Sequence, residues 1–168
     1  MLQTRQGIEI RSAVAGDVSA ILGFIRALAE YEKLSDACIA TEDLLHEHLF
    51  GPAKAAEVLI AELDAKPVAF ALFFGTFSTF LARPGIYLED LFVMPEARGQ
   101  GVGKALLAAV AGIAVQRNCG RLEWAVLDWN DPAIGFYKKL GAVPMEEWTT
   151  FRVAGETLRE LAAGKNAE

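Results

Sequence analysis

The chain has 168 residues, enough for one domain with a buried core, and its composition of 53% hydrophobic and 23% charged residues excludes a disordered protein. Its formal net charge of −6 argues against a nucleic-acid partner, because phosphates require a basic surface, and it suits a cationic substrate. No apolar run is long enough to span a membrane, and the first ten residues do not resemble a secretory signal, so we expect a cytoplasmic protein with no membrane partner.

Hydrophobic periodicity divides the first half of the chain into short strands and two helices. The apolar residues of segment 17–31 recur every three or four positions, which predicts an amphipathic helix with Asp17 in its first turn. Thr41 and the acidic residues after it predict the capped start of a second helix, which Gly51 and Pro52 end. Strands are predicted at residues 8–10, 58–63 and 68–74.

The second half begins with a predicted loop at residues 75–85, which is unusually apolar for a connection because it contains Phe77, Phe80 and Leu81. The remaining predicted elements are a central strand at 86–93, a helix at 102–117, a strand at 122–127, a helix at 132–140, a strand at 149–153 and a helix at 156–163. This order predicts one α/β domain over residues 1–168, with a mixed sheet and helices on both of its faces.

Glycines occupy every second position from Gly99 to Gly103, between the central strand and the helix after it. Because the first N–H groups of a helix are unpaired and glycines let a ligand approach the backbone, this arrangement predicts a phosphate site. A P-loop is excluded, since Ala105 stands where that motif needs Ser or Thr. A dinucleotide fingerprint is excluded as well, since Lys104 and Leu106 occupy its possible sixth positions.

The segment Arg98-Gly-Gln-Gly-Val-Gly103 fits the pattern Arg/Gln-x-x-Gly-x-Gly/Ala. It resembles the pyrophosphate loop of the GNAT superfamily of acetyl-CoA-dependent N-acetyltransferases. Segments 29–32, 87–90, 125–130 and 136–142 are similar to the diamine (spermidine/spermine) and thialysine acetyltransferase branch, so the resemblance covers about residues 8–161. It implies the GNAT fold, in which a mixed, mostly antiparallel central sheet is flanked by helices on both faces.

The resemblance also implies where acetyl-CoA binds. Main-chain groups of the central strand would pair with the pantetheine arm, and the glycine loop would hold the pyrophosphate on its backbone N–H groups, with two cationic side chains adding charge. The implied cofactor residues are Leu91, Phe92, Val93, Arg98, Gly99, Gln100, Gly101, Val102, Gly103, Lys104, Asn130 and Tyr137. Asn130 would bond the cofactor or cap the helix that follows it.

Two residues are implied as catalytic. Tyr137 takes the position of the general acid, since a phenol with a pKa of about 10 can give a proton to the departing thiolate. An aromatic core residue is the alternative for the same side chain. Glu89 is the candidate base, through water, because an alkylammonium must lose a proton before it can attack. Tyr31, Glu32, Glu89 and Asp90 would contact the substrate amine, with Glu89 and Asp90 on different faces of the strand.

These residues indicate acetyl transfer to a primary amine of a small cationic substrate, a diamine, a polyamine or a lysine-like amino acid such as thialysine. The amine would attack directly in a ternary complex, since neither Cys38 nor Cys119 matches a catalytic position. Phe80 replaces the tryptophan that the polyamine enzymes carry near the site, and the segment before Trp148 is shortened, which leaves the identity of the amine open. A CoA-binding regulatory module and an acetyltransferase for protein lysines or N-termini are the alternatives.

Two further expectations concern metals and partners. His46 and His48 point apart on a helix, with no third ligand nearby in sequence, so no metal is expected. Members of the branch pair as homodimers, and a homodimer is expected here, with segment 75–85 and the final strand as contact regions.

Overall fold

The computed structural model describes residues 7–165, so six of the ten N-terminal residues considered for a secretory signal lie outside it. The chain divides into two compact units, Met1–Leu127 and Asp128–Glu168. The first unit contains the sheet, and the second contains the last two helices. Within residues 7–165, no helix is both long and apolar enough to cross a bilayer.

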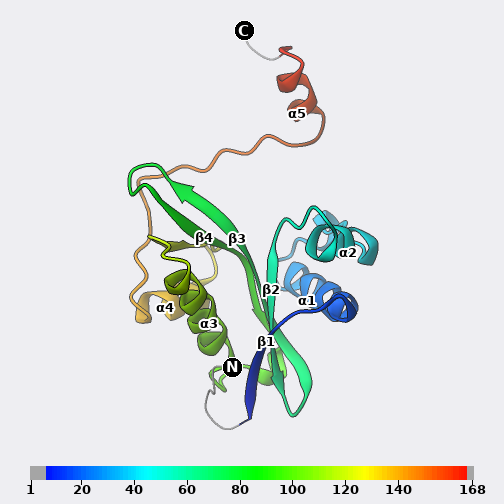
Figure 1. The fold of residues 1–168 in the computed structure, drawn as a ribbon, viewed down its shortest axis with the longest axis vertical. Helices are drawn as coiled ribbons and strands as arrows, with labels where there is room; N and C mark the ends of the chain where they lie inside the picture. Colours follow the sequence, from blue (N-terminus) through cyan, green and yellow to red (C-terminus); the bar gives the residue numbers. More distant parts are fainter. Residues whose placement is uncertain (1–6, 166–168) are drawn as a thin grey trace. The chain divides into compact units, whose positions relative to one another are not determined.

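The first unit is built on a five-stranded sheet in the order β1-β2-β3-β4-β5 (Figure 1). Its strands are β1 (Ile8–Ser12), β2 (Glu57–Leu63), β3 (Lys66–Ser78), β4 (Arg83–Val93) and β5 (Leu122–Glu123). The first four strands pair antiparallel with their neighbours, and β5 pairs parallel with β4. The predicted mixed, mostly antiparallel sheet is therefore confirmed.

Helices cover both faces of this sheet, as predicted. Figure 1 shows α1 (Val18–Tyr31) and α2 (Glu42–Phe50) on one face and α3 (Val102–Gln116) on the other. Short 3-10 turns lie at Ala15–Asp17, Ser35–Ala37 and Pro95–Ala97. The cap predicted for the second helix is confirmed, because Thr41 Oγ1 accepts a hydrogen bond from the N–H of Leu44 at 3.3 Å.

The hydrophobic face of α1 closes the core on its side of the sheet. Ile21 and Phe24 pack there against strand residues, and the rings of Phe24 and Phe70 stack with centroids 5.5 Å apart. The buried members of this core cluster are Ile21, Phe24, Leu49, Val58, Ile60, Phe70 and Phe92. One residue of the cluster, Phe92, lies on β4, so the packing of α1 also fixes the strand that carries the predicted site.

The prediction of a loop at residues 75–85 is wrong. Strands β3 and β4 continue through most of it, pairing from Gly75 opposite Ile86 to Ser78 opposite Arg83, and only residues 79–82 connect them. The glycines and the proline of this segment weaken its strand signal, but pairing with a neighbouring strand overrides local preference. Phe80, in the connection, is 96% exposed.

The strands predicted near the end of the chain are mostly wrong. Only Leu122–Glu123 of segment 122–127 is a strand, and residues 149–153 are not a strand. A strand needs a hydrogen-bonded neighbour, and a favourable composition does not supply one. The two helices of the second unit are confirmed, as α4 (Asp131–Lys139) and α5 (Gly155–Ala162).

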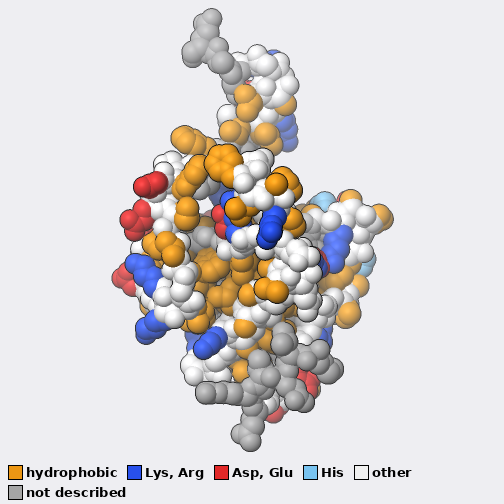
Figure 2. Space-filling model, turned by 60° about the vertical axis from the view of Figure 1, so that its left-hand side comes forward, with side chains coloured by type: hydrophobic (Ala, Val, Ile, Leu, Met, Phe, Trp, Pro, Cys, Tyr) orange, Lys and Arg blue, Asp and Glu red, His pale blue; other side chains and the backbone are white. Residues whose placement is uncertain are grey.

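Several large apolar side chains remain exposed, among them Trp148 at 73% and Phe151 at 90%. Figure 2 shows apolar side chains spread over one face of the molecule, with charged ones between them. Exposed apolar surface of this kind is typical of sites that contact another molecule.

Candidate active site

Helix α3 begins with backbone N–H groups that no side chain caps. Its N-cap residue is Gly101, and its first turn holds no acidic residue but carries the exposed Lys104. The first N–H groups of a helix have no acceptor within the helix, and this end of the helix dipole is positive. The start of α3 therefore fits a phosphate group, in agreement with the loop pattern in the sequence.

The glycine loop leaves room for such a ligand. Gly99 and Gly101 have φ angles of 76° and 87°, in the left-handed region that glycine adopts without steric cost. A Cβ atom added at either position would meet no atom within 4 Å, so the backbone is open to approach. Gly103 instead lies against β4, where an added Cβ would be 3.5 Å from Val93 Cγ2.

Two side chains tie the loop to the chain before it. Gln100 Nε2 donates to the carbonyl of Glu96 at 3.2 Å, and Arg98 Nε donates to the carbonyl of Val93 at 2.9 Å. The resemblance implies that main-chain groups of Val93 pair with the pantetheine arm. The Val93 carbonyl already accepts one hydrogen bond, from Arg98. Arg98 extends back toward β4 and does not cap the start of α3.

A β-bulge interrupts the pairing of β3 and β4 at Glu89. Leu72 lies opposite Asp90 and Phe73 opposite Leu88, so Glu89 is an extra residue with no partner on β3. Glu89 is exposed, whereas Asp90 is half-buried. The bulge separates these two adjacent carboxyl groups into different environments.

The bulge also decides which face of the sheet Asp90 occupies. Leu72, its partner on β3, packs against the core cluster under α1, and paired residues share a face. Phe92, two residues along the strand, belongs to the same cluster, whereas Leu91 and Val93 lie near Gly103 at the start of α3. Asp90 and Phe92 therefore face α1.

The C-terminus of α1 carries Tyr31 and Glu32. The N–H of Leu34 donates to the Ala29 carbonyl at 2.7 Å and the N–H of Lys33 donates to the Glu30 carbonyl at 3.0 Å, which is the Schellman pattern. Glu32 is the half-buried C-cap residue. Burial raises the pKa of its carboxyl group.

The charges of Glu32 and Glu89 act on Asp90, and we call these three residues the acidic cluster. Burial, together with the nearby charges of Glu89 and Glu32, raises the pKa of Asp90 to about 6. No positively charged side chain contributes to the shift of the Asp90 pKa. The negative charge of the cluster therefore favours the binding of an ammonium group.

Arg98 lies over two aromatic rings. Its guanidinium carbon is 5.0 Å from the ring centroid of Tyr31 and 5.3 Å from that of Phe92, distances typical of cation–π contacts. Arg98 therefore connects the glycine loop, β4 and the end of α1. The fold brings five of the predicted site residues into one region of the first unit: Tyr31, Glu32, Glu89, Asp90 and Arg98.

Tyr137 and Asn130 belong to the second unit. Asn130 is 7% exposed, and its Oδ1 accepts from the N–H of Ala133 at 3.3 Å, so it caps α4, one of the two roles expected for it. Tyr137 is half-buried, and its ring centroid is 5.3 Å from that of Phe136. The roles of both residues toward acetyl-CoA stay predictions.

Sequence reasoning missed the bulge and the stacking of Arg98 on Tyr31. A bulge leaves no local pattern in the sequence, since it depends on the register with β3. The contact between Arg98 and Tyr31 joins residues 67 positions apart and had no sequence signal either. The adjacent pair Glu89-Asp90 in an apolar strand was the one visible hint of an irregularity.

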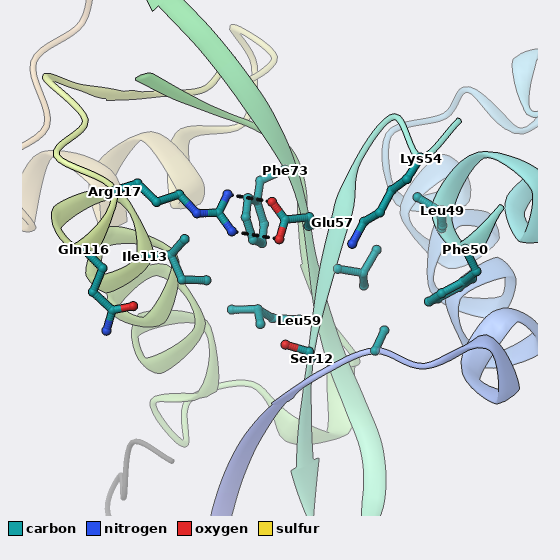
Figure 3. A pocket seen from close by; sticks show the side chains of 12 residues that line it. Ser12, Leu49, Phe50, Lys54, Glu57, Leu59, Phe73, Ile113, Gln116 and Arg117 are labelled. Atoms are coloured by element: carbon teal, nitrogen blue, oxygen red, sulfur yellow. Dashed lines mark hydrogen bonds and ion pairs between the residues drawn. The ribbon is translucent and has the colours of Figure 1, made fainter. Parts of the chain in front are cut away.

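A separate hollow lies in the first unit, between the end of β1, the start of β2 and the C-terminal ends of α2 and α3 (Figure 3). It has a volume of about 260 Å³ and none of the predicted site residues lines it. Arg117 closes one side by a bidentate ion pair to Glu57, with Nη1 and Nη2 at 2.6 and 2.8 Å from the carboxylate oxygens. This pair lowers the pKa of Glu57.

Residues 7–165 contain no group of three histidine, cysteine or acidic side chains arranged to hold a metal ion. His46 lies near the ring of Phe50, with centroids 6.3 Å apart.

Known proteins share this chain's sequence and fold. The family model described as "Acetyltransferase (GNAT) family" matches residues 25–142. A thialysine N-epsilon-acetyltransferase of Bos taurus is 43% identical, over 92% of this chain and 97% of its own. An L-ornithine N5-acetyltransferase of Arabidopsis thaliana is 32% identical, over 90% of this chain and 86% of its own.

A solved structure confirms the architecture. An integron cassette protein from the mobile metagenome of V. cholerae superposes with a TM-score of 0.80 at 30% identity, over 94% of this chain and 99% of its own. The uncapped helix start, the glycine loop and the sheet agree with the family match over more than half of the chain. The chain belongs to the GNAT family of acetyltransferases.

Proposed function

We propose that this protein transfers the acetyl group of acetyl-CoA to a primary amine of a small cationic molecule, by direct attack in a ternary complex. The observation that carries the proposal is the acidic cluster beside the bulge of β4, on the strand that leads into the glycine loop. The names of the relatives support an amine acceptor of the lysine or ornithine type. A diamine or polyamine is the alternative acceptor.

The glycine loop and the start of α3 would hold the phosphates of acetyl-CoA. Backbone N–H groups of residues 99–104 are the donors, with Lys104 adding charge, and the Leu91 to Val93 backbone would pair with the pantetheine arm. Acetyl-CoA supplies the thioester carbon that the amine attacks.

The acidic cluster has two tasks in the proposed reaction. Its negative charge attracts the ammonium group but also favours the protonated form, so the proton must leave before attack. Glu89 is exposed at the bulge and can pass that proton to water, whereas the half-buried Asp90 and Glu32, with Tyr31, hold the amine. The carbon–sulfur bond breaks as the carbon–nitrogen bond forms, and Tyr137 would return a proton to the sulfur.

Release of free thiol from acetyl-CoA tests the proposal. The panel should include thialysine, L-ornithine, L-lysine, putrescine and spermidine, with a peptide bearing an internal lysine as a separate arm. Release with one or more small amines supports the proposal. Binding of CoA without release for any acceptor would support the regulatory module, and release with the peptide alone would support a protein acetyltransferase.

We also propose a cytoplasmic homodimer. The exposed apolar side chains of the β3–β4 hairpin and of segment 149–153 support an interface, among them Phe77, Phe80 and Phe151. Sedimentation should give twice the mass of the chain. A single monomer species at micromolar concentration would contradict the homodimer.

A further inference from the structure

The bulge in β4 changes which side chains share a face with Asp90. In a regular strand every second residue faces the same way, so Leu88 would share the face of Asp90. Because Glu89 is an extra residue, the alternation is interrupted there and Tyr87 takes this place instead. Asp90 and Tyr87 therefore lie on the same face of the sheet, the face on which α1 lies.

The partners of these two residues on β3 agree with this placement. Leu72 pairs with Asp90, and Phe74, two residues further along β3, pairs with Tyr87. Residues two apart on a strand share a face, and so do cross-strand partners. The rings of Phe74 and Tyr87 have centroids 5.5 Å apart, and we call these two residues the aromatic pair. The pair lies roughly 7 Å along the sheet from Leu72 and Asp90.

The aromatic pair lies at the edge of the hydrophobic core. Among the described residues, the core cluster under α1 and the side chains packed against it extend to Leu72 and Phe92 and leave out both rings of the pair. Both rings are half-buried. By contrast, Phe73 and Leu88, the adjacent pair on the other face, are each 1% exposed. The aromatic pair therefore keeps apolar surface that a ligand can contact, on the same face as Asp90.

The carbon chain of an acceptor needs such a surface. The acidic cluster attracts the ammonium group, and removing the methylene groups that follow it from water is favourable. On one side of Asp90 the next residue of the face, Phe92, is 5% exposed and lies under the guanidinium of Arg98. On the other side lies the aromatic pair, at a distance that a chain of several carbons can span. The chain is therefore directed toward the pair.

We propose that Phe74 and Tyr87 form the surface on which the carbon chain of the acceptor lies. This inference rests on the proposed acetyl transfer and adds two specificity residues to the acceptor side of the same site. The bulge gives the two parts of the acceptor separate places, because it turns Asp90 and the ring of Tyr87 to one face and leaves Glu89 exposed.

A series of amines tests the inference on the native protein. Methylamine, propylamine and pentylamine carry the same ammonium group and differ in chain length. Each is measured as an inhibitor competing with the best acceptor of the thiol-release panel, at saturating acetyl-CoA. If the chain lies on an apolar surface, inhibition should become stronger by roughly twofold for each added methylene group. Equal inhibition by all three amines would overturn the inference.

The variants Tyr87→Leu and Phe74→Leu identify the residues responsible. Each should raise the KM for the acceptor by about fivefold, leave the KM for acetyl-CoA unchanged and remove most of the gain from chain length. Tyr87→Phe keeps the ring and should stay within about twofold of the native protein. Phe50→Leu is the matched control, because Phe50 is also a half-buried aromatic residue and lines the hollow of Figure 3. It should lower the melting temperature and leave both KM values unchanged.

Methylamine also separates contact with the chain from an effect on the acidic cluster. Its inhibition constant should be the same in the native protein and in both leucine variants, since it has no chain to lose. If that constant rises as much as the KM for the acceptor, the aromatic pair acts through the acidic cluster and the inference is overturned. An unchanged KM in both leucine variants would overturn it as well, while acetyl transfer stands. Failure of the native protein to release thiol with any amine would instead overturn the proposed function.

Discussion

Glu32 at the end of α1 and Asp90 on β4 are 58 positions apart in the sequence, yet the charge of Glu32 is one cause of the raised pKa of Asp90. Helix α1 places its last turn over the face of β4 that the bulge turns toward it. The folded protein therefore holds like charges together at a cost in stability, which is typical of a site that binds cations.

Replacing Asp90 by asparagine should stabilise the folded protein at neutral pH. The pKa of Asp90 rises from 3.8 to about 6 on folding, so between these pH values the folded state binds more protons than the unfolded state. The free energy of unfolding then falls as the pH rises through this window. Above it, the ionised carboxylate costs on the order of 3 kcal/mol, which the amide avoids.

Urea unfolding at pH 7 and pH 4 measures this difference. The gain from Asp90→Asn should be present at pH 7 and nearly absent at pH 4, where the native carboxyl group is protonated. Asp36→Asn, at an exposed position, is the control and should change stability little at either pH. A loss of stability at pH 7 for Asp90→Asn would contradict the burial of an unpaired charge.

Binding of a cationic amine near pH 6 should release a proton. A bound ammonium favours the ionised form of Asp90 and so lowers its pKa below the value of about 6 in the free protein. Calorimetric titration with an unreactive amine in the presence of CoA, in two buffers of different ionisation enthalpy, reports the number of protons released. The release should disappear in Asp90→Asn and at pH 8, and its persistence in the variant would assign it to another group.

Alanine should be tolerated differently at two glycines of the loop. Gly101 has a φ of 87°, so Gly101→Ala should cost roughly 1–2 kcal/mol and weaken CoA binding. Gly103 lies in the first turn of α3, and a Cβ there would be in ordinary contact with Val93 and Leu91 at 3.5 and 3.7 Å. Gly103→Ala should leave the melting temperature unchanged or raise it slightly, because alanine favours a helix. Equal destabilisation by both would argue against the left-handed backbone at Gly101.

Removing the hydroxyl group of Tyr137 should slow turnover more than it weakens binding. The variant Tyr137→Phe keeps the ring that lies against Phe136, so its stability should change by less than about 1 kcal/mol. Loss of a general acid typically lowers kcat by about a hundredfold or more. Steady-state kinetics with both substrates varied give kcat and the KM for acetyl-CoA separately. An unchanged kcat at every pH would exclude Tyr137 as the acid.

Much of the fold could be read from local patterns. The three helices of the first unit follow from apolar periodicity and from caps such as Thr41, because these signals act within a few residues. The predictions failed at three segments. Segment 75–85 was predicted as a loop and is mostly strand, whereas 124–127 and 149–153 were predicted as strands and are not. Whether such a segment forms a strand depends on whether a neighbouring strand lies beside it. That pairing is a property of the whole sheet, so their composition misled in both directions.

The sequence by itself determined the family, the glycine loop at the start of α3 and the identity of the acidic and aromatic residues around the site. It could do so because a loop motif and a helix start are local arrangements of backbone N–H groups. Only the tertiary structure decided that Glu89 is an unpaired bulge residue, that Asp90 faces Glu32, and that Arg98 lies on Tyr31 and Phe92. Register and helix packing join residues far apart in the chain, and burial then sets their charge states.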